Sequence, residues 1–177
     1  FPRNLPEHIR KDYSRGAEVE TFDALKRKAP PDFYIFYNCD WIDPRENPVP
    51  TKDGEADFII AHRIFGFICL EVKVGDVRRN GETKEWYRQL KHSKKKIKNP
   101  VAQAKNSKFV ILELLKRKWP RGQMPYIKMC HGVILPHLSR PKNTEDFGAD
   151  MPISMFAFKD DMINLWGCIS IMMLQKE

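Results

Sequence analysis

The hydrophobic positions of this chain fall into segments with two different periods, one typical of helices and one typical of strands. Near the N-terminus, Val19, Phe22 and Leu25 recur at helical spacing. Ser14 is expected to cap this helix and Pro30 to end it. Later segments are short, β-branched or aromatic, and separated by turn formers, as strands are. The expected elements, in chain order, are a helix at 14–28, strands at 33–37, 56–61 and 65–74, a hairpin at 77–87, a helix at 100–118, strands at 126–135 and 153–158, and a last helix opened by Asp160 and Asp161.

This order of elements predicts an α/β fold in which a central mixed β-sheet is flanked by α-helices. A length of 177 residues corresponds to one domain, which we expect at 14–177 behind an N-terminal arm at 1–13. The turn-rich stretches 40–54 and 139–151 are expected to be loops. Within the hairpin, Asn80-Gly81 favours a type I′ turn.

The net charge indicates which binding partners to expect, and the cysteines indicate the redox compartment. The chain has 31 Lys and Arg against 23 Asp and Glu, a net charge of +8, which favours a polyanion. Nucleic acid is the first candidate and an anionic membrane surface the second. The four cysteines form no CxxC pair and no signal peptide is visible, so we expect a reducing, cytoplasmic setting without a zinc site. The chain begins at Phe1 rather than Met, which fits a fragment of a longer protein.

Chemistry is concentrated in the two central strand segments. Strand alternation places Glu71 and Lys73 together, on the face opposite the neighbouring apolar residues. Ionisable groups in an otherwise apolar strand are costly to bury without partners, and a metal ion and a phosphate would provide them. For this Glu-x-Lys pattern alone, a structural ion pair is the more common explanation. The preceding Gly54-Glu55-Ala56-Asp57 favours a catalytic site instead.

Hydrolysis of a phosphodiester needs charge neutralisation and a hydroxide, and Mg²⁺ provides both when one or two carboxylates hold it. Asp57 and Glu71 are suitable ligands, and the backbone carbonyl of Val72 is a candidate to complete the shell. Lys73 is expected beside the attacking water, where it would stabilise the developing charge.

The runs Gly54–Ile60 and Gly66–Lys73 resemble the two core motifs of the PD-(D/E)XK nuclease superfamily, and more closely those of the nuclease-related domain (NERD) family. Gly16-Ala17-Glu18, Trp86 after a turn, and the helix start Asn99–Ala104 are similar to the same family, so the resemblance covers roughly residues 14–118. It implies a restriction-endonuclease-like core and Mg²⁺-dependent DNA cleavage, with Mn²⁺ as a substitute. Some members of the family are fused to helicase or kinase modules.

Two helix residues join the candidate site through this resemblance. Glu18 lies on the apolar stripe of its helix, and it is either an end-of-helix residue that reaches solvent or a residue that holds the metal or its water. Gln103 shares a face with Val110 and Leu114. Two roles are equally open for Gln103. Its side chain either hydrogen-bonds Lys73 or the scissile phosphate, or it is a buried amide that hydrogen-bonds the backbone. The candidate catalytic set is Glu18, Asp57, Glu71, Lys73 and Gln103, with Glu18, Asp57 and Glu71 as metal ligands.

The lysine-rich stretch between the strands and the Gln103 helix is the expected contact surface for backbone phosphates, although such runs are usually only solvated. Trp86, within this stretch, is expected in the core rather than stacked on a base, and Glu55 is expected only to begin its strand. The basic residues assigned to nucleic-acid binding are Lys84, Arg88, Lys91, Lys94, Lys95, Lys96 and Lys98.

Three functions remain open on these grounds. The first is a Mg²⁺-dependent nuclease domain that hydrolyses DNA, with RNA not excluded. The second is a nucleic-acid-binding module that retains the nuclease fold but catalyses weakly. The third is a basic α/β domain that binds protein partners.

Overall fold

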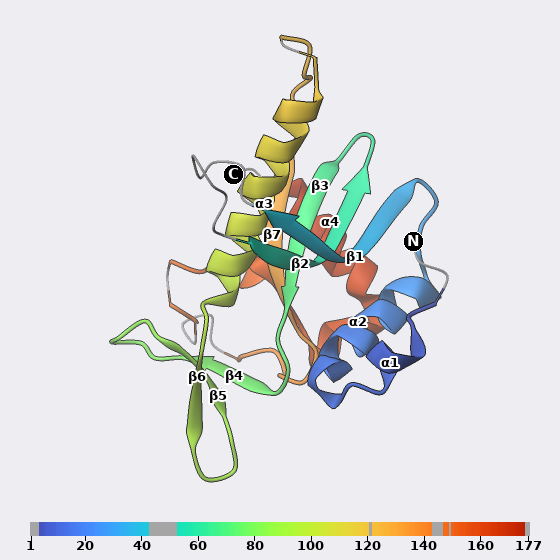
Figure 1. Cartoon of the computed structure of the whole chain (residues 1–177). Helices are drawn as coiled ribbons and strands as arrows, with labels where there is room; N and C mark the ends of the chain where they lie inside the picture. The colour runs from blue at the N-terminus through green and yellow to red at the C-terminus, as the bar shows by residue number, and fades with distance from the viewer. Residues whose placement is uncertain (1–3, 43–52, 121, 143–146, 149, 176–177) are drawn as a thin grey trace.

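A mixed five-stranded sheet with helices on both faces forms the centre of the computed structural model, and a small three-stranded antiparallel sheet lies at one end (Figure 1). The structure describes residues 4–42, 53–120, 122–142, 147–148 and 150–175. The expected α/β fold, with a mixed sheet flanked by helices, is therefore confirmed.

The central sheet has the order β1-β2-β3-β7-β8. The first three strands pair antiparallel, whereas β3–β7 and β7–β8 pair parallel. The middle strand, β3, is buried on both faces from Phe67 to Val72, which accounts for its almost continuous apolar sequence. The strands are β1 (Phe33–Ile42), β2 (Asp53–His62), β3 (Gly66–Val72), β7 (Met129–Leu135) and β8 (Phe156–Phe158).

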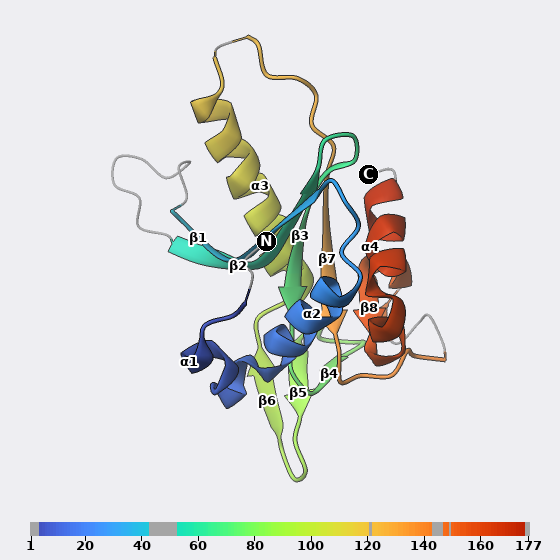
Figure 2. The ribbon, with the colours of Figure 1, turned by 90° about the vertical axis from the view of Figure 1, so that its right-hand side faces the viewer.

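Helices cover both faces of this sheet, with α3 (Pro100–Lys118) on one side and α2 (Gly16–Arg27) and α4 (Leu165–Leu174) on the other (Figure 2). The α2 and α4 side holds the larger core cluster, in which Phe22 and Ile169 pack with Ile68. The start of α3 is fixed by Asn99, whose side chain accepts a hydrogen bond from the Ala102 N–H at 3.1 Å.

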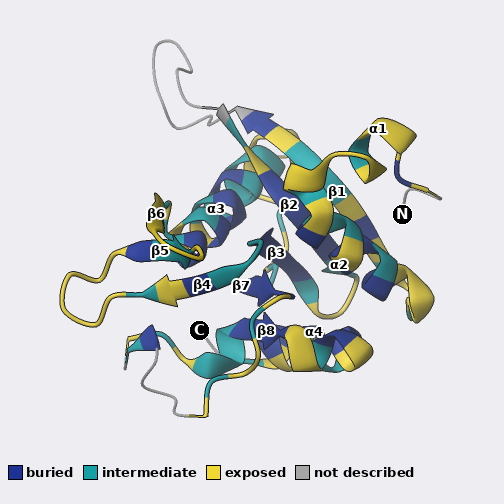
Figure 3. Cartoon of the chain, turned by 90° about the horizontal axis from the view of Figure 1, so that it is seen from below, coloured by how far each residue is buried: buried dark blue, intermediate teal, exposed yellow. Residues whose placement is uncertain are grey.

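The small sheet consists of β4 (Asp76–Arg79), β5 (Trp86–Gln89) and β6 (Lys94–Ile97). Trp86 attaches it to the core: its side chain is 2% exposed and stacks on Phe147 with ring centroids 5.4 Å apart. The prediction that Trp86 belongs to the core is confirmed. The three lysines that open β6, in contrast, are exposed (Figure 3).

Several local predictions were wrong. Ser14 does not cap α2: it lies within a 3-10 turn (Tyr13–Arg15) that precedes the helix and is itself capped by Asp12, whose side chain accepts from the Ser14 N–H, whereas Arg15 at the N-cap of α2 makes no side-chain cap bond. The Asn80-Gly81 turn is a wider loop, closed by a hydrogen bond from the Asn80 N–H to the Glu85 carbonyl. The strand β6 was missed because consecutive lysines show no alternation.

Element boundaries also shifted. The strand expected at 33–37 continues to Ile42, the one at 126–135 begins only at Met129, and the one at 153–158 opens with a 3-10 turn. Part of the expected arm forms a short helix, α1 (Glu7–Arg10), and Leu5 is buried. Most of the loop predicted at 40–54, and residues 143–146 and 149 of the second loop, lie outside the described residues. No helix among the described residues is long and apolar enough to cross a membrane.

Candidate active site

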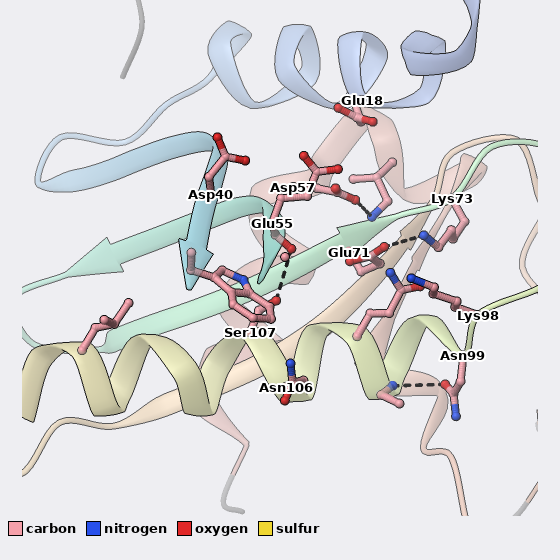
Figure 4. Close-up of a pocket in the computed structure, with 16 residues that line it drawn as sticks. Glu18, Asp40, Glu55, Asp57, Glu71, Lys73, Lys98, Asn99, Asn106 and Ser107 are labelled. Carbon is pink, nitrogen blue, oxygen red and sulfur yellow. Dashed lines mark hydrogen bonds and ion pairs between the residues drawn. The ribbon is translucent and has the colours of Figure 1, made fainter. Parts of the chain in front are cut away.

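A cleft of about 1260 Å³ lies between α2, the last part of β1, the start of β2, the end of β3 and the helix α3. Its lining contains every residue of the candidate catalytic set (Figure 4). Among the described residues it is lined by five carboxylates and two lysines, although the whole chain carries a net charge of +8. The cleft is therefore an acidic site in a basic protein.

Asp57 and Glu71 form the floor of this cleft on the adjacent strands β2 and β3. Both are buried, with exposed fractions of 6% and 3%. One oxygen of Asp57, Oδ2, accepts the Val72 N–H at 2.6 Å, which links the two strands where their regular pairing has ended. Strand alternation, as predicted, brings Glu71 into the cleft while Leu70 and Val72 pack into the α2 side of the core.

Lys73 follows directly after β3 and donates a hydrogen bond to Glu71 Oε1, with which it forms an ion pair. Its backbone N–H donates to the Ile134 carbonyl at 3.0 Å, which continues the parallel pairing with β7 past the end of the strand. The ammonium group is therefore held on the cleft side, beside Glu71, rather than in the core.

The two central carboxylates carry a cost in their ionised form. Burial raises the pKa of Asp57, and the neighbouring Glu71 charge raises it further. The pKa of Glu71 is likewise raised by burial, against the opposing effect of Lys73. One lysine does not compensate two buried carboxylates, so the site favours an additional cation.

Glu18 reaches into the cleft from the first turn of α2, toward Asp57 (Figure 4). It is not an end-of-helix residue free in solvent, since its side chain is 17% exposed and its Oε2 accepts the Tyr37 hydroxyl at 2.7 Å. Burial raises the pKa of Glu18, and the bond from Tyr37 opposes this shift. Sequence reasoning missed Tyr37, although a tyrosine hydroxyl near a core normally finds a partner.

The first turns of α3 form the opposite wall. Gln103 lines the cleft, and its Oε1 is buried without a hydrogen-bond partner among the described residues. The Gln103 side chain is therefore not a buried amide whose oxygen is bonded to the backbone. Because Lys73 can only donate and Gln103 Oε1 has no donor within the described residues, the expected hydrogen bond between these two side chains is not formed. Ser107 donates to the Glu55 carbonyl at 3.4 Å, which ties α3 to β2. Glu55 lies near the start of β2, as expected, and also lines the cleft.

The predicted nucleic-acid-binding residues occupy different positions around the small sheet. Lys98 lines the cleft. Lys94 lies over the Tyr87 ring at 4.8 Å, and Lys96 pairs with Glu85. Arg88 is half-buried, with an Nε that finds no partner in the described part of the chain. The remaining members, Lys84, Lys91 and Lys95, are exposed.

No group of three His, Cys, Asp or Glu side chains is placed to hold a metal ion within the described residues. Mg²⁺ does not require one, because it keeps several waters and is usually bound by one or two carboxylates and substrate phosphate. Asp57 and Glu71 fit this ion: they are adjacent, hard oxygen donors, and the single ammonium group of Lys73 does not offset the charge of both. Glu18 as a third ligand stays a prediction.

Comparison with known proteins assigns the chain to a family. The family described as NERD, nuclease-related domain, matches residues 14–135, which is more than half of the chain and contains the whole candidate catalytic set. No curated protein and no solved structure matches the chain. The family match and the position of the cleft within it lead to one conclusion: the chain belongs to the nuclease-related domain family.

Proposed function

We propose that this chain is a Mg²⁺-dependent nuclease domain that hydrolyses phosphodiester bonds of DNA. The observation that carries the proposal is the buried pair Asp57 and Glu71 beside Lys73, at the floor of an open cleft. Two buried carboxylates that share one lysine as counter-charge fit a site for a divalent cation and a phosphate. The family match supports nuclease-related chemistry without specifying the substrate.

Bound to the carboxylates, Mg²⁺ would lower the pKa of a bound water and neutralise phosphate charge. The residues of the chain would do the rest. Asp57 and Glu71 hold the site negative, and the Val72 N–H keeps Asp57 in one orientation. Lys73 is already on the cleft side of Glu71, so its ammonium group can turn from this ion pair to the phosphate and stabilise the transition-state charge.

Substrate would be held by charge outside the acidic floor. The exposed lysines of β6 and Lys98 at the rim give a route for a phosphate backbone toward the cleft. These lysines would contact phosphates and not base edges, so we propose that the domain binds DNA with little sequence preference. The four cysteines are free, which fits a cytoplasmic setting, and an attached helicase or kinase module would supply directed access to DNA.

The test is a cleavage assay on linear duplex, closed circular and single-stranded DNA, with an RNA arm, in Mg²⁺ and in EDTA. We expect cleavage that requires Mg²⁺ and that is lost in Lys73→Ala. Cleavage of closed circles would identify an endonuclease. Tight, salt-dependent DNA binding without cleavage by the parent would replace the proposal with a nucleic-acid-binding module. If the parent neither binds nor cleaves any nucleic acid, a protein-binding domain becomes the better explanation.

A further inference from the structure

A chain of hydrogen bonds links the cleft to the edge strand of the sheet through Glu18. The Tyr37 hydroxyl donates to Glu18 Oε2 at 2.7 Å, and it accepts from Arg15 Nη1 at 3.2 Å. The same Arg15 nitrogen donates to Asn38 Oδ1 at 2.7 Å. Arg15 precedes α2 and the other two residues lie on β1, so the bonds join separate elements.

The Tyr37 hydroxyl is fixed by the packing of its ring. The ring lies 5.2 Å from the Phe58 ring and 6.2 Å from the Phe22 ring in an edge-on arrangement. Both phenylalanines are fully buried. The hydroxyl therefore projects from a rigid support toward a carboxylate on α2, whose own side chain has several rotatable bonds.

The contact is also close to the part of the sheet that carries Asp57. The pairs Tyr37–Phe58 and Cys39–Ala56 flank Asn38 and Asp57. Tyr37 and Phe58 pack on the α2 side of the sheet, whereas Cys39 and Ala56 pack on the α3 side, so both strands change face at this point. Asn38 permits the change with a φ of 51°, and Arg15 binds its side chain.

In the described part of the chain, the contacts found for the Glu18 carboxylate involve one of its two oxygens. The contacts from Tyr37 and Arg15 both engage Oε2, at 2.7 and 3.6 Å, which leaves Oε1 for a cation or for its bound water. A carboxylate that must hold a metal-bound water at one position benefits from this arrangement, because outer partners of metal ligands fix their orientation.

We propose that Tyr37, steadied by Arg15, is a positioning residue that fixes the Glu18 carboxylate over Asp57 for its part in binding the cation; this inference rests on the proposed function. Tyr37 acts through Glu18 and touches neither substrate nor metal. Removal of the Tyr37 hydroxyl alone should leave the Glu18 carboxylate without its fixed orientation and should therefore weaken cation binding.

The experiment is a double-mutant cycle with Tyr37→Phe and Glu18→Gln. Tyr37→Phe keeps the ring and its packing and removes only the hydroxyl. Mn²⁺ affinity, measured by calorimetry without substrate, should fall about 10- to 100-fold, the loss usual for an outer partner of a metal ligand. In the Glu18→Gln background, Tyr37→Phe should have no further effect, because the group it positions is gone. Single-turnover cleavage should follow the same pattern.

Tyr34→Phe is the matched control, since Tyr34 lies on the same strand with 63% of its surface exposed. It should leave Mn²⁺ affinity unchanged. Arg15→Gln provides a second variant if Tyr37→Phe folds poorly, and its effect should also vanish in Glu18→Gln. An equal loss from Tyr37→Phe in both backgrounds would show a structural role and overturn the inference, as would unchanged affinity in Tyr37→Phe.

The outcomes separate this inference from the proposed function. A parent that binds Mn²⁺ but cleaves nothing refutes the nuclease, while the cycle on Mn²⁺ affinity still decides the role of Tyr37. A parent that cleaves while Tyr37→Phe matches it in affinity and rate refutes only the positioning role. A parent that binds no Mn²⁺ refutes both.

Discussion

Replacement of Asp57 by asparagine should make the metal-free protein more stable at neutral pH. Asp57 is 6% exposed, and burial followed by the Glu71 charge raises its pKa from 3.8 to about 8. Asparagine removes the charge but keeps an oxygen that can accept the Val72 N–H. The side chain needed for metal binding is thus expected to reduce the stability of the empty fold, as functional groups often do.

The size of the effect follows from the shift. One pKa unit corresponds to about 1.4 kcal/mol, and a folded-state Asp57 with a pKa of about 8 is mostly protonated at pH 7, so the shift costs the folded state at most about 4 kcal/mol at that pH. Glu71 and Lys73 share the same interactions, and some relaxation accompanies ionisation, so we expect a gain of about 1–3 kcal/mol for Asp57→Asn. The raised pKa means that the stability of the parent is greatest below the unfolded-state value and falls as the pH rises toward 8. The advantage of Asp57→Asn should therefore shrink as the pH is lowered from 7 to 4.

Urea unfolding in EDTA across this pH range measures the difference directly. Asp40→Asn is the control, because Asp40 lines the same cleft but is exposed, and it should change stability by less than about 0.5 kcal/mol. Saturating Mg²⁺ should reverse the order, since only the parent retains both carboxylates; at 1,000 times the Kd, binding stabilises by about 4.1 kcal/mol. If Asp57→Asn is no more stable than the parent in EDTA at pH 7, the inferred cost of this buried charge is wrong.

Three further predictions concern catalysis, binding and packing. Lys73→Ala should leave Mg²⁺ affinity intact or slightly tighter, because a nearby cation is removed, yet slow single-turnover cleavage by about two to three orders of magnitude; equal loss of affinity would make Lys73 structural. Neutralising Lys94–Lys96 together should reduce the slope of log affinity for duplex DNA against log salt by up to about 2.7, and an unchanged slope would mean that β6 is only solvated. Trp86→Ala should lower the free energy of unfolding by about 3–5 kcal/mol, measured in urea, whereas loss of DNA binding at full stability would favour base stacking instead.

The central part of the site was predictable because its rules are local. Glu71 and Lys73 are two residues apart, and strand alternation alone places them together once β3 is recognised. Asp57 followed from the preceding strand and the family motif. The helix α3 was predicted because Asn99 and Pro100 mark its start in the sequence itself.

The missing parts depend on contacts between distant segments. Tyr37 was read only as an aromatic strand residue, because its hydrogen bond to Glu18 exists only after α2 packs on the sheet. The strand β6 carries no alternation, and its pairing with β5 through Trp86 and Ile97 comes from tertiary structure. The change of face of β1 and β2 beside Asn38 is also absent from the sequence pattern, because it shows only in the packing of the paired strands.

The topology of the sheet also has a consequence for the order in which the chain assembles. Asp57 and Glu71 lie on a hairpin whose strands, β2 and β3, are joined by a very short turn, so their pairing needs little loop closure. The parallel pairing of β3 with β7 must wait until the small sheet and α3 have bridged the gap between them. We therefore expect the two carboxylates to be brought together early in folding, before α3 completes the wall of the cleft. We expect a divalent cation to ease this early step, so that metal would speed folding as well as slow unfolding.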